Sequence, residues 1–247
     1  KARKNKLKID WNTFEPVKPN FIGTKTIEVE LSELVDFIDW TPFFQSWELF
    51  GKYPAILTDE VVGEQATAVF ADAQEMLKQL LAEKWLTAKA VYGIFEANTI
   101  NDDDIAVQNH TLLTLRQQSQ KTAGAPNISL ADFIAPKNSG IQDYIGLFCV
   151  TSGFGVDEKA AEFEKQLDDY NSILVKALGD RLAEAFAEYL HEKVRKEFWG
   201  YAADEVLCKE DLIEESYKGI RPAPGYPACP DHLEKPTIWK LLNVEEE

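Results

Sequence analysis

The sequence of 247 residues predicts an α+β fold, a single domain with a central antiparallel sheet flanked by long helices. Two runs, residues 88–100 and 143–153, are rich in β-branched and aromatic side chains, which are typical of strands. Two longer stretches, 58–84 and 157–201, repeat apolar residues every three or four positions, as amphipathic helices do. A hydrophobic content of 45% is enough to bury a sizeable core, and no internal repeat is apparent.

The N-terminal part places one carboxylate at the end of a short predicted helix. Residues 11–23 contain two prolines and indicate an irregular lead-in, whereas the pattern of residues 30–38 predicts a helix. Asp39 follows this helix directly. Its carboxylate either caps the helix that comes next or contacts a ligand, and from the residues alone we favour the cap.

Residues 58–84 are predicted to form an amphipathic helix, and we expect its stripe of apolar side chains to lie in the core rather than at a functional site. After the strand at 88–100, the turn-like residues 101–104 and a second apolar run predict an antiparallel pair. The acidic residues 102–104 lack the alternating ligands and closing glutamate of a calcium loop, so we predict a solvated turn. The apolar stripe of the helix consists of Val62, Ala66, Val69, Phe70, Ala73, Met76, Leu77 and Leu80.

The strand at 143–153 contains Cys149, which we expect to be inert because a cysteine inside an apolar strand behaves as a small hydrophobe. The glycines of residues 151–155 lack the lysine and hydroxyl residue of a phosphate-binding loop. They also lack the spacing of a dinucleotide fingerprint, so a Rossmann-type nucleotide site is not indicated.

The longest helical pattern, 157–201, is expected to break near Gly179. Within it, Glu188 and His191 have the spacing of a di-iron ligand pair, but the second pair that such a site needs is missing. Cys229 and His232 are likewise half of a zinc site. We therefore predict no metal site, and no catalytic residue is assigned.

The charge and cysteine content narrow the class of partners and the compartment. Acidic residues outnumber basic ones by 42 to 26, and the formal charge of −16 would repel the phosphates of nucleic acid and anionic lipid. Three cysteines without paired spacing indicate a reducing, cytoplasmic setting. No apolar run is long enough to cross a membrane, and the basic start KARKNKLK is interpreted as a cut linker or a solvated tail.

A stiff loop at residues 221–235, RPAPGYPACPDHLEK, is the most informative stretch of the chain. Each of its four prolines fixes φ and removes a donor, and Gly225 permits a bend. We expect a helix at 209–219, ended by Gly219, to lead into this loop, and another helix to begin near Pro236. A preformed loop with one arginine suits a small ligand. By composition alone, however, it is more typical of a connector packed on a helix.

The exact sequences of this loop and of one earlier stretch favour the ligand-binding interpretation over the connector. The loop sequence RPAPGYPACPDH and the stretch DWTPFFQSWELFGKYP resemble the S-adenosylmethionine-binding activation domain of cobalamin-dependent methionine synthase, a 5-methyltetrahydrofolate–homocysteine methyltransferase. The resemblance covers most of the chain. It extends to residues 130–153, 168–202 and 217–235.

The resemblance implies a binding site for S-adenosylmethionine. It assigns Asp39 of the IDWTPFF stretch to the ligand's ammonium and sulfonium charge, and Arg221 to its carboxylate. Further contacts are implied for residues of the RPAPGYP loop and for two acidic positions near the family's pocket. These are Ala223, Gly225 and Tyr226 of the loop, and Glu184 and Glu215.

The resemblance also implies domains, reaction and partners. Residues 1–23 would be a lead-in from an upstream cobalamin-binding domain, and 24–247 the activation domain, without its last C-terminal segment. The domain would supply the methyl group for reductive methylation of oxidised cob(II)alamin, with an electron from flavodoxin or a similar reductase.

The resemblance implies that cobalamin is carried by the separate domain, in agreement with the missing DxHxxG-type cobalt-ligand motif, and the zinc of the full enzyme is not expected here. The chain alone should therefore not make methionine. The alternative is a docking module that binds flavodoxin and the cobalamin domain without holding the ligand. Binding that depends on Arg221 separates the two hypotheses.

Overall fold

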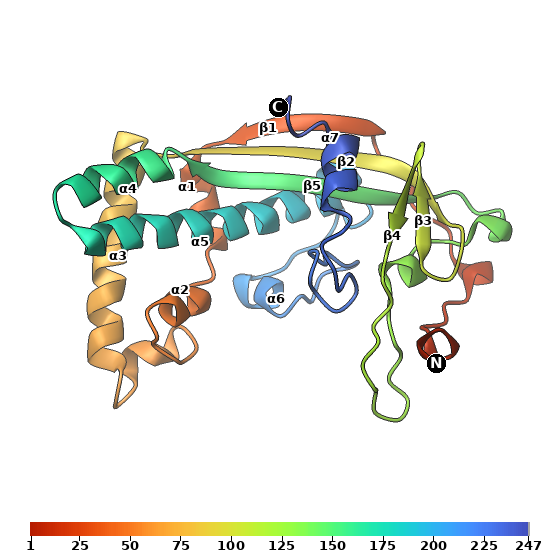
Figure 1. The fold of residues 1–247 in the computed structure, drawn as a ribbon, viewed down its shortest axis with the longest axis horizontal. Helices are drawn as coiled ribbons and strands as arrows, with labels where there is room; N and C mark the ends of the chain where they lie inside the picture. The colour runs from red at the N-terminus through yellow and green to blue at the C-terminus, as the bar shows by residue number, and fades with distance from the viewer. Residues whose placement is uncertain (247) are drawn as a thin grey trace.

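A computed structural model describes residues 1–246 and confirms the α+β architecture, with one five-stranded antiparallel sheet (Figure 1). The central strand β2 (Thr87–Thr99) pairs along one edge with β5 (Asp143–Phe154). Along its other edge β2 pairs first with β1 (Gly23–Val29) and then with β3 (Asp104–Val107). The pairing of β2 with β3 confirms the antiparallel pair predicted for the strand at 88–100 and the run that follows it, although a tight hairpin divides that run into β3 and β4 (His110–Leu113).

Alternate residues of β2 face two separate hydrophobic cores, because successive side chains of a strand point to opposite faces of the sheet. Ala88, Ala90 and Tyr92 belong to the first core. Val91 and Phe95 belong to the second. Both faces of β2 are therefore covered, which explains why its sequence is an almost continuous apolar run.

The first core lies between the sheet and most of the helices. The long helix α5 (Asp169–Lys193) runs along the sheet, and α3 (Gly63–Glu83) stands crosswise at its far end (Figure 1). The helices α1 (Leu31–Leu34), α2 (Thr41–Ser46) and α4 (Val156–Lys165) complete this layer. No helix among residues 1–246 is long and apolar enough to cross a membrane. Fully buried members of this core include Leu34, Ile38, Phe43, Phe44, Ala73, Leu80, Leu178, Leu182 and Phe186.

The second core lies on the opposite face and is smaller. The helix α7 (Lys235–Leu242) covers it, and Leu242 packs so closely on β2 that a Cβ at Gly93 would lie 3.1 Å from its side chain. As predicted, Pro236 stands in the first turn of α7, where the missing N–H costs nothing. The loop at residues 221–234 therefore leads from the α5 side of the sheet to the α7 side.

The predicted break of the long helix near Gly179 is wrong. Gly179 lies inside α5, and a Cβ there would be only 2.8 Å from Val156 of α4, so the glycine serves close helix packing. The chain instead turns at residues 166–168, between α4 and α5, where Leu167 has a φ of 59°. Asp168 then starts α5 by accepting a hydrogen bond from the N–H of Asn171.

The predicted helix at 209–219 is also shorter than expected. The helix α6 covers only Lys209–Ile213, and the chain is irregular from there to α7. Gly219 does have a φ of 95°, but it lies in this irregular segment and caps no helix.

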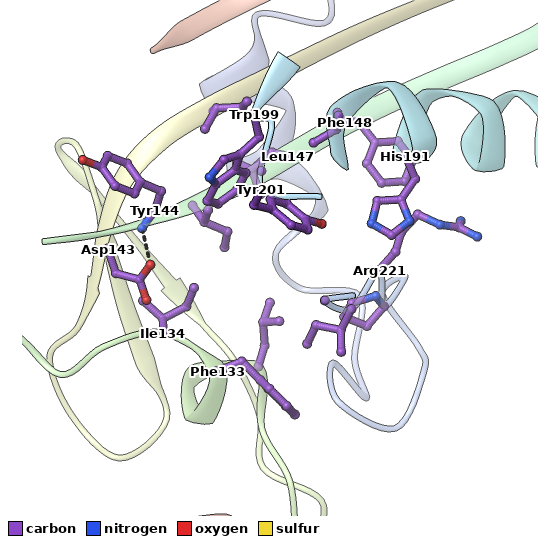
Figure 2. A pocket seen from close by; sticks show the side chains of 18 of the residues that line it. Phe133, Ile134, Asp143, Tyr144, Leu147, Phe148, His191, Trp199, Tyr201 and Arg221 are labelled. Carbon is purple, nitrogen blue, oxygen red and sulfur yellow. Dashed lines mark hydrogen bonds between the residues drawn. The ribbon is translucent and has the colours of Figure 1, made fainter. Parts of the chain in front are cut away.

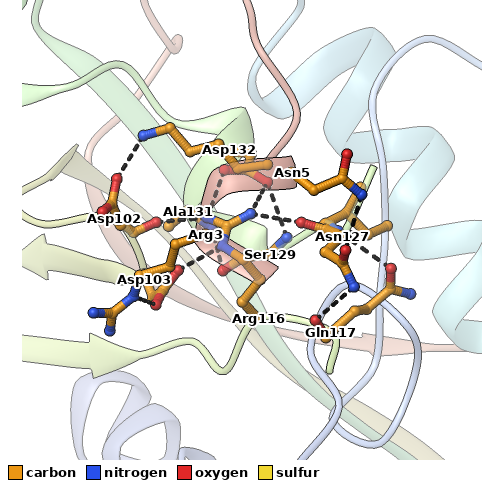
Figure 3. A network of polar contacts seen from close by, with 12 residues as sticks. Arg3, Asn5, Asp102, Asp103, Arg116, Gln117, Asn127, Ser129, Ala131 and Asp132 are labelled. Carbon is orange, nitrogen blue, oxygen red and sulfur yellow. Dashed lines mark hydrogen bonds and ion pairs between the residues drawn. The ribbon is translucent and has the colours of Figure 1, made fainter. Parts of the chain in front are cut away.

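A buried arginine organises the end of the molecule beyond the β3–β4 hairpin (Figure 3). Arg116 is 1% exposed, and each of its five N–H groups donates a hydrogen bond, of 2.5 to 2.7 Å. The acceptors are the carboxylates of Asp103 and Asp132 and the carbonyl oxygens of Asp102 and Asn127. We call these five residues the Arg116 cluster.

The Arg116 cluster corrects two predictions. Asp102 and Asp103 form a turn, but not a merely solvated one, because Asp103 binds the buried Arg116 and is itself only 14% exposed. The basic N-terminal segment is not a loose tail either. Arg3 binds Asp103 at 2.7 Å, Lys6 binds Asp102, and Asn5 donates a hydrogen bond into the loop that follows β4.

Candidate functional site

The proline-rich loop folds into a tight turn, as its sequence predicts. The N–H of Gly225 donates to the carbonyl oxygen of Cys229 at 2.7 Å, and the N–H of Tyr226 donates to that of Ala223 at 3.0 Å. Gly225 has a φ of 102°, and a Cβ there would lie 2.9 Å from the ring of His232. Only glycine fits this position without a shift of its surroundings.

Arg221, at the start of the loop, is held by a glutamate of α5. Its Nη2 donates to Glu188 Oε2 at 2.8 Å, and both side chains are mostly buried, at 20% and 14% exposed. Burial raises the pKa of the Glu188 carboxyl, and the charges of Arg221 and Arg195 oppose that rise. Burial likewise raises the pKa of Tyr217, and Arg221 opposes it there too.

A second arginine lies deeper behind this pair. Arg195 is fully buried and donates from Nε to Glu205 at 2.8 Å, while its guanidinium lies 4.5 Å from the ring centre of Tyr217. Its Nη1 is 2.8 Å from Nδ1 of His191. Because a guanidinium has no acceptor, this Nδ1 must accept and His191 is neutral. Burial, reinforced by Arg195 and Arg221, lowers the pKa of His191 to about 3.

We call Glu188, His191, Arg195, Glu205, Tyr217 and Arg221 the α5 charge cluster. Glu188, His191 and Arg195 follow one another at spacings of three and four, which places them on one face at the end of α5. Arg195 stands in a π-helical turn, Val194–Phe198, directly after α5. Such turns are rare and frequently found at functional sites.

Three buried polar atoms of the α5 charge cluster have no hydrogen-bond partner anywhere in residues 1–246. They are Glu188 Oε1, Arg195 Nη2 and Arg221 Nε. Leaving a buried donor or acceptor unpaired costs about 1–3 kcal/mol, so such groups in a native protein call for a ligand or an ordered water. Their concentration in one place marks this cluster as a candidate site.

The cluster borders a large cavity, which has a volume of about 720 Å³. Figure 2 shows His191 and Arg221 at one side of it and Asp143 at the opposite side, with aromatic and aliphatic side chains between. The walls are mostly apolar, and the lining includes Phe133, Ile134, Tyr144, Leu147, Phe148, Trp199 and Tyr201.

Asp143, a carboxylate of the cavity wall, is committed to the protein itself. The two carboxylate oxygens of Asp143 accept hydrogen bonds from the N–H groups of Ala135 and Tyr144, each at 2.8 Å, and burial raises the pKa of Asp143. Burial also raises the pKa of the Cys229 thiol. No group of three potential metal ligands was found among residues 1–246. The arrangement suits binding rather than acid–base chemistry.

Two of the loop residues predicted to contact the ligand, Arg221 and Ala223, line this cavity. Gly225 and Tyr226 form the turn beyond it, and the Tyr226 side chain is 63% exposed. The loop therefore presents its first residues to the cavity and its tip to solvent.

The two predicted glutamates lie near the α5 charge cluster rather than in the cavity wall. Glu184 is exposed on α5, one helical turn before Glu188. Glu215 has a left-handed backbone, with a φ of 54°, and its charge contributes to the raised pKa of Glu188.

Asp39 precedes the N-cap residue of α2, which is Trp40, so it is not the cap that the residues alone favoured. Its carboxylate accepts a hydrogen bond from the N–H of Thr41, the first residue of α2, at 2.9 Å. Just before it, Phe37 packs edge-on against Tyr189 of α5, with ring centres 5.5 Å apart. Asp39 thus follows a segment that is packed on the same helix as Glu184 and Glu188.

Sequence reasoning missed most of the α5 charge cluster. The spacing of Glu188 and His191 was noticed, but it suggested a metal pair, whereas their partners are the arginines 195 and 221. Glu205 and Tyr217 carry no recognisable motif. Only the fold brings them to the end of α5.

Comparison with known proteins relates this chain to one protein family and to a solved structure. The family model described as "Vitamin B12 dependent methionine synthase, activation domain" matches residues 30–247. A solved structure described as "Crystal Structure of the MetH Reactivation Domain bound to AdoHcy" is 54% identical to this chain, with a TM-score of 0.92. The match covers 99% of this chain and 77% of that chain.

Proposed function

Because the chain belongs to the family of vitamin B12-dependent methionine synthase activation domains, we propose that it binds S-adenosylmethionine and supplies its methyl group to restore an oxidised cobalamin. The related reactivation domain was solved with AdoHcy, which is S-adenosylmethionine without the transferable methyl group. The same kind of ligand is therefore the best candidate for this chain.

The position and the hydrogen bonding of Arg221 are the main support for this proposal. Its guanidinium stands at the cavity, is fixed by Glu188, and keeps a buried Nε–H without a partner in the described chain. A guanidinium binds a carboxylate through two parallel hydrogen bonds, so Arg221 is suited to the carboxylate of the ligand's methionine part.

The acidic residues among the remaining predicted contacts would supply negative charge for the cationic groups of the ligand. S-adenosylmethionine carries an ammonium and a sulfonium, and carboxylates beside the bound ligand would stabilise both. We propose Glu184, Glu215 and Asp39 for this role, with Tyr226 and the main chain of Ala223 and Gly225 against the adenosine. The stiff loop would lose little entropy on binding, because its turn is already formed.

The reaction itself needs positioning more than acid–base groups. The sulfonium of the ligand is already an activated methyl donor, so the protein has to orient the methyl group and exclude water. The acceptor is the cobalamin of a separate domain of the same enzyme, and the accompanying electron would come from flavodoxin or a similar flavoprotein. We place the chain in the cytoplasm with these partners.

Titration calorimetry with S-adenosylmethionine tests the proposal, with the parent protein beside Arg221→Ala. We expect the variant to bind about 100-fold more weakly, since removing one partner of a hydrogen-bonded charge pair costs roughly 2–5 kcal/mol. Arg181→Ala is the matched control, because it removes a partly buried arginine of α5 outside the charge cluster. This control should bind like the parent.

Two results would contradict the proposal. A folded parent that does not bind S-adenosylmethionine would favour the alternative of a docking module without ligand. An Arg221→Ala variant that binds as tightly as the parent would place the ligand elsewhere in the chain.

A further inference from the structure

Arg221 keeps a buried nitrogen without a hydrogen bond while Glu188 holds another. Nη2 carries two hydrogens, and one of them is donated to Glu188 Oε2 at 2.8 Å. The neighbouring Nε–H is buried and has no partner within residues 1–246. A guanidinium has five N–H donors, so donors remain for a ligand carboxylate while the bond to Glu188 stays intact.

Glu188 is itself held from behind. Its Oε1 lies 3.8 Å from Nη1 of the fully buried Arg195. Arg195 is fixed by Glu205 at 2.8 Å and by His191 at 2.8 Å. The charges alternate from Glu205 through Arg195 and Glu188 to Arg221, and the first three side chains have little freedom to move.

We infer that Glu188 and Arg195 are positioning residues for the amino-acid end of the ligand. Glu188 sets the orientation of the Arg221 guanidinium, and Arg195 sets that of Glu188. The inference rests on the proposed function, because it takes Arg221 as the group that binds the ligand carboxylate. Neither Glu188 nor Arg195 needs to touch the ligand.

A purely structural ion pair would be expected to satisfy its own polar atoms. In this cluster three buried atoms have no hydrogen-bond partner among residues 1–246, one on each of Glu188, Arg195 and Arg221. Arg195 also departs from regular helix geometry, since it lies in the π-helical turn. Unpaired groups and irregular backbone are costly features that persist mainly where a site needs them.

The test compares two ligands on Glu188→Gln, which keeps the size of the side chain and removes its charge. S-adenosylmethionine has the amino-acid part, whereas 5′-deoxy-5′-methylthioadenosine has only the nucleoside thioether. We expect the affinity for S-adenosylmethionine to fall about tenfold, within the range found for residues that share one network. The affinity for methylthioadenosine should stay the same.

A second variant and a matched control complete the experiment. Glu188→Asp withdraws the carboxylate from Arg221 by one methylene and should produce the same selective loss. Glu192→Gln, one turn further along α5, removes a carboxylate that pairs with Lys196 at 3.3 Å and is 29% exposed. It should change neither affinity.

The possible outcomes separate this inference from the proposed function. If the folded parent does not bind S-adenosylmethionine, the proposed function itself fails. If the parent binds S-adenosylmethionine and both Glu188 variants bind it as tightly as the parent does, Glu188 does not position Arg221. An equal loss for both ligands would show a general structural role and would also overturn the inference.

Discussion

Replacing Arg116 by methionine is expected to destabilise the protein by about 3–5 kcal/mol, the usual cost of breaking a buried ion pair from one side. The substitution removes five hydrogen bonds at once. It leaves the carboxylate of Asp132, 4% exposed, without its counter-charge, and the carbonyl oxygens of Asp102 and Asn127 without this donor. Urea unfolding followed by circular dichroism measures the loss.

Arg3→Met is the matched control for this prediction. Arg3 binds the same Asp103 at the same distance of 2.7 Å, but its side chain is 69% exposed. Pairs on the surface contribute little, because water and salt screen them. Similar midpoints of unfolding for Arg116→Met and Arg3→Met would mean that the Arg116 cluster does not stabilise the fold.

Gly155→Ala is expected to cost roughly 2–5 kcal/mol of stability, the sum of backbone strain and overpacking. Gly155 joins β5 to α4 with a φ of 97°, which side chains rarely adopt. A Cβ at this position would lie 2.3 Å from the carbonyl oxygen of Trp85, an impossible contact. Relieving this contact would require a shift of the backbone directly before β2. A change of side-chain rotamer therefore cannot avoid the loss of stability.

Gly124→Ala separates the two parts of that cost. Gly124 has a similar φ of 87°, but no atom lies within 4 Å of a Cβ built there. Gly124→Ala should therefore lose only the stability that backbone strain costs, about 1–2 kcal/mol. Thermal unfolding of both variants gives the comparison, and equal losses would show that the contact with Trp85 is relieved at no cost.

The fold could be predicted where the local pattern and the tertiary environment agree. The apolar run at 88–100 became β2, and the predicted stripe of the helix at 58–84 lies in the first core. β1 was missed because its residues are partly exposed and charged, so that pairing with β2 rather than composition makes it a strand. The break at Gly179 was wrong because tight packing on Val156 outweighs the poor helix propensity of glycine.

The candidate site was predictable only in part, for a similar reason. The loop carries Arg221 and the bend at Gly225 in its own sequence, and a string of prolines makes its stiffness visible. The partner of Arg221 is 33 residues away on α5, and Arg195 reaches Glu205 from a π-helical turn. Such contacts depend on how the chain returns to the end of α5, which no local pattern encodes.

The burial of β2 on both faces and both edges has a consequence for amide hydrogen exchange. Its N–H groups are bonded within the sheet and shielded by two cores, so they exchange with solvent only when the whole domain unfolds. The turn at Gly225 and Tyr226 is held by a few bonds at the surface and can open alone. A ligand at the loop would therefore slow exchange in the turn most directly, while the amides of β2 report the stability of the domain as a whole.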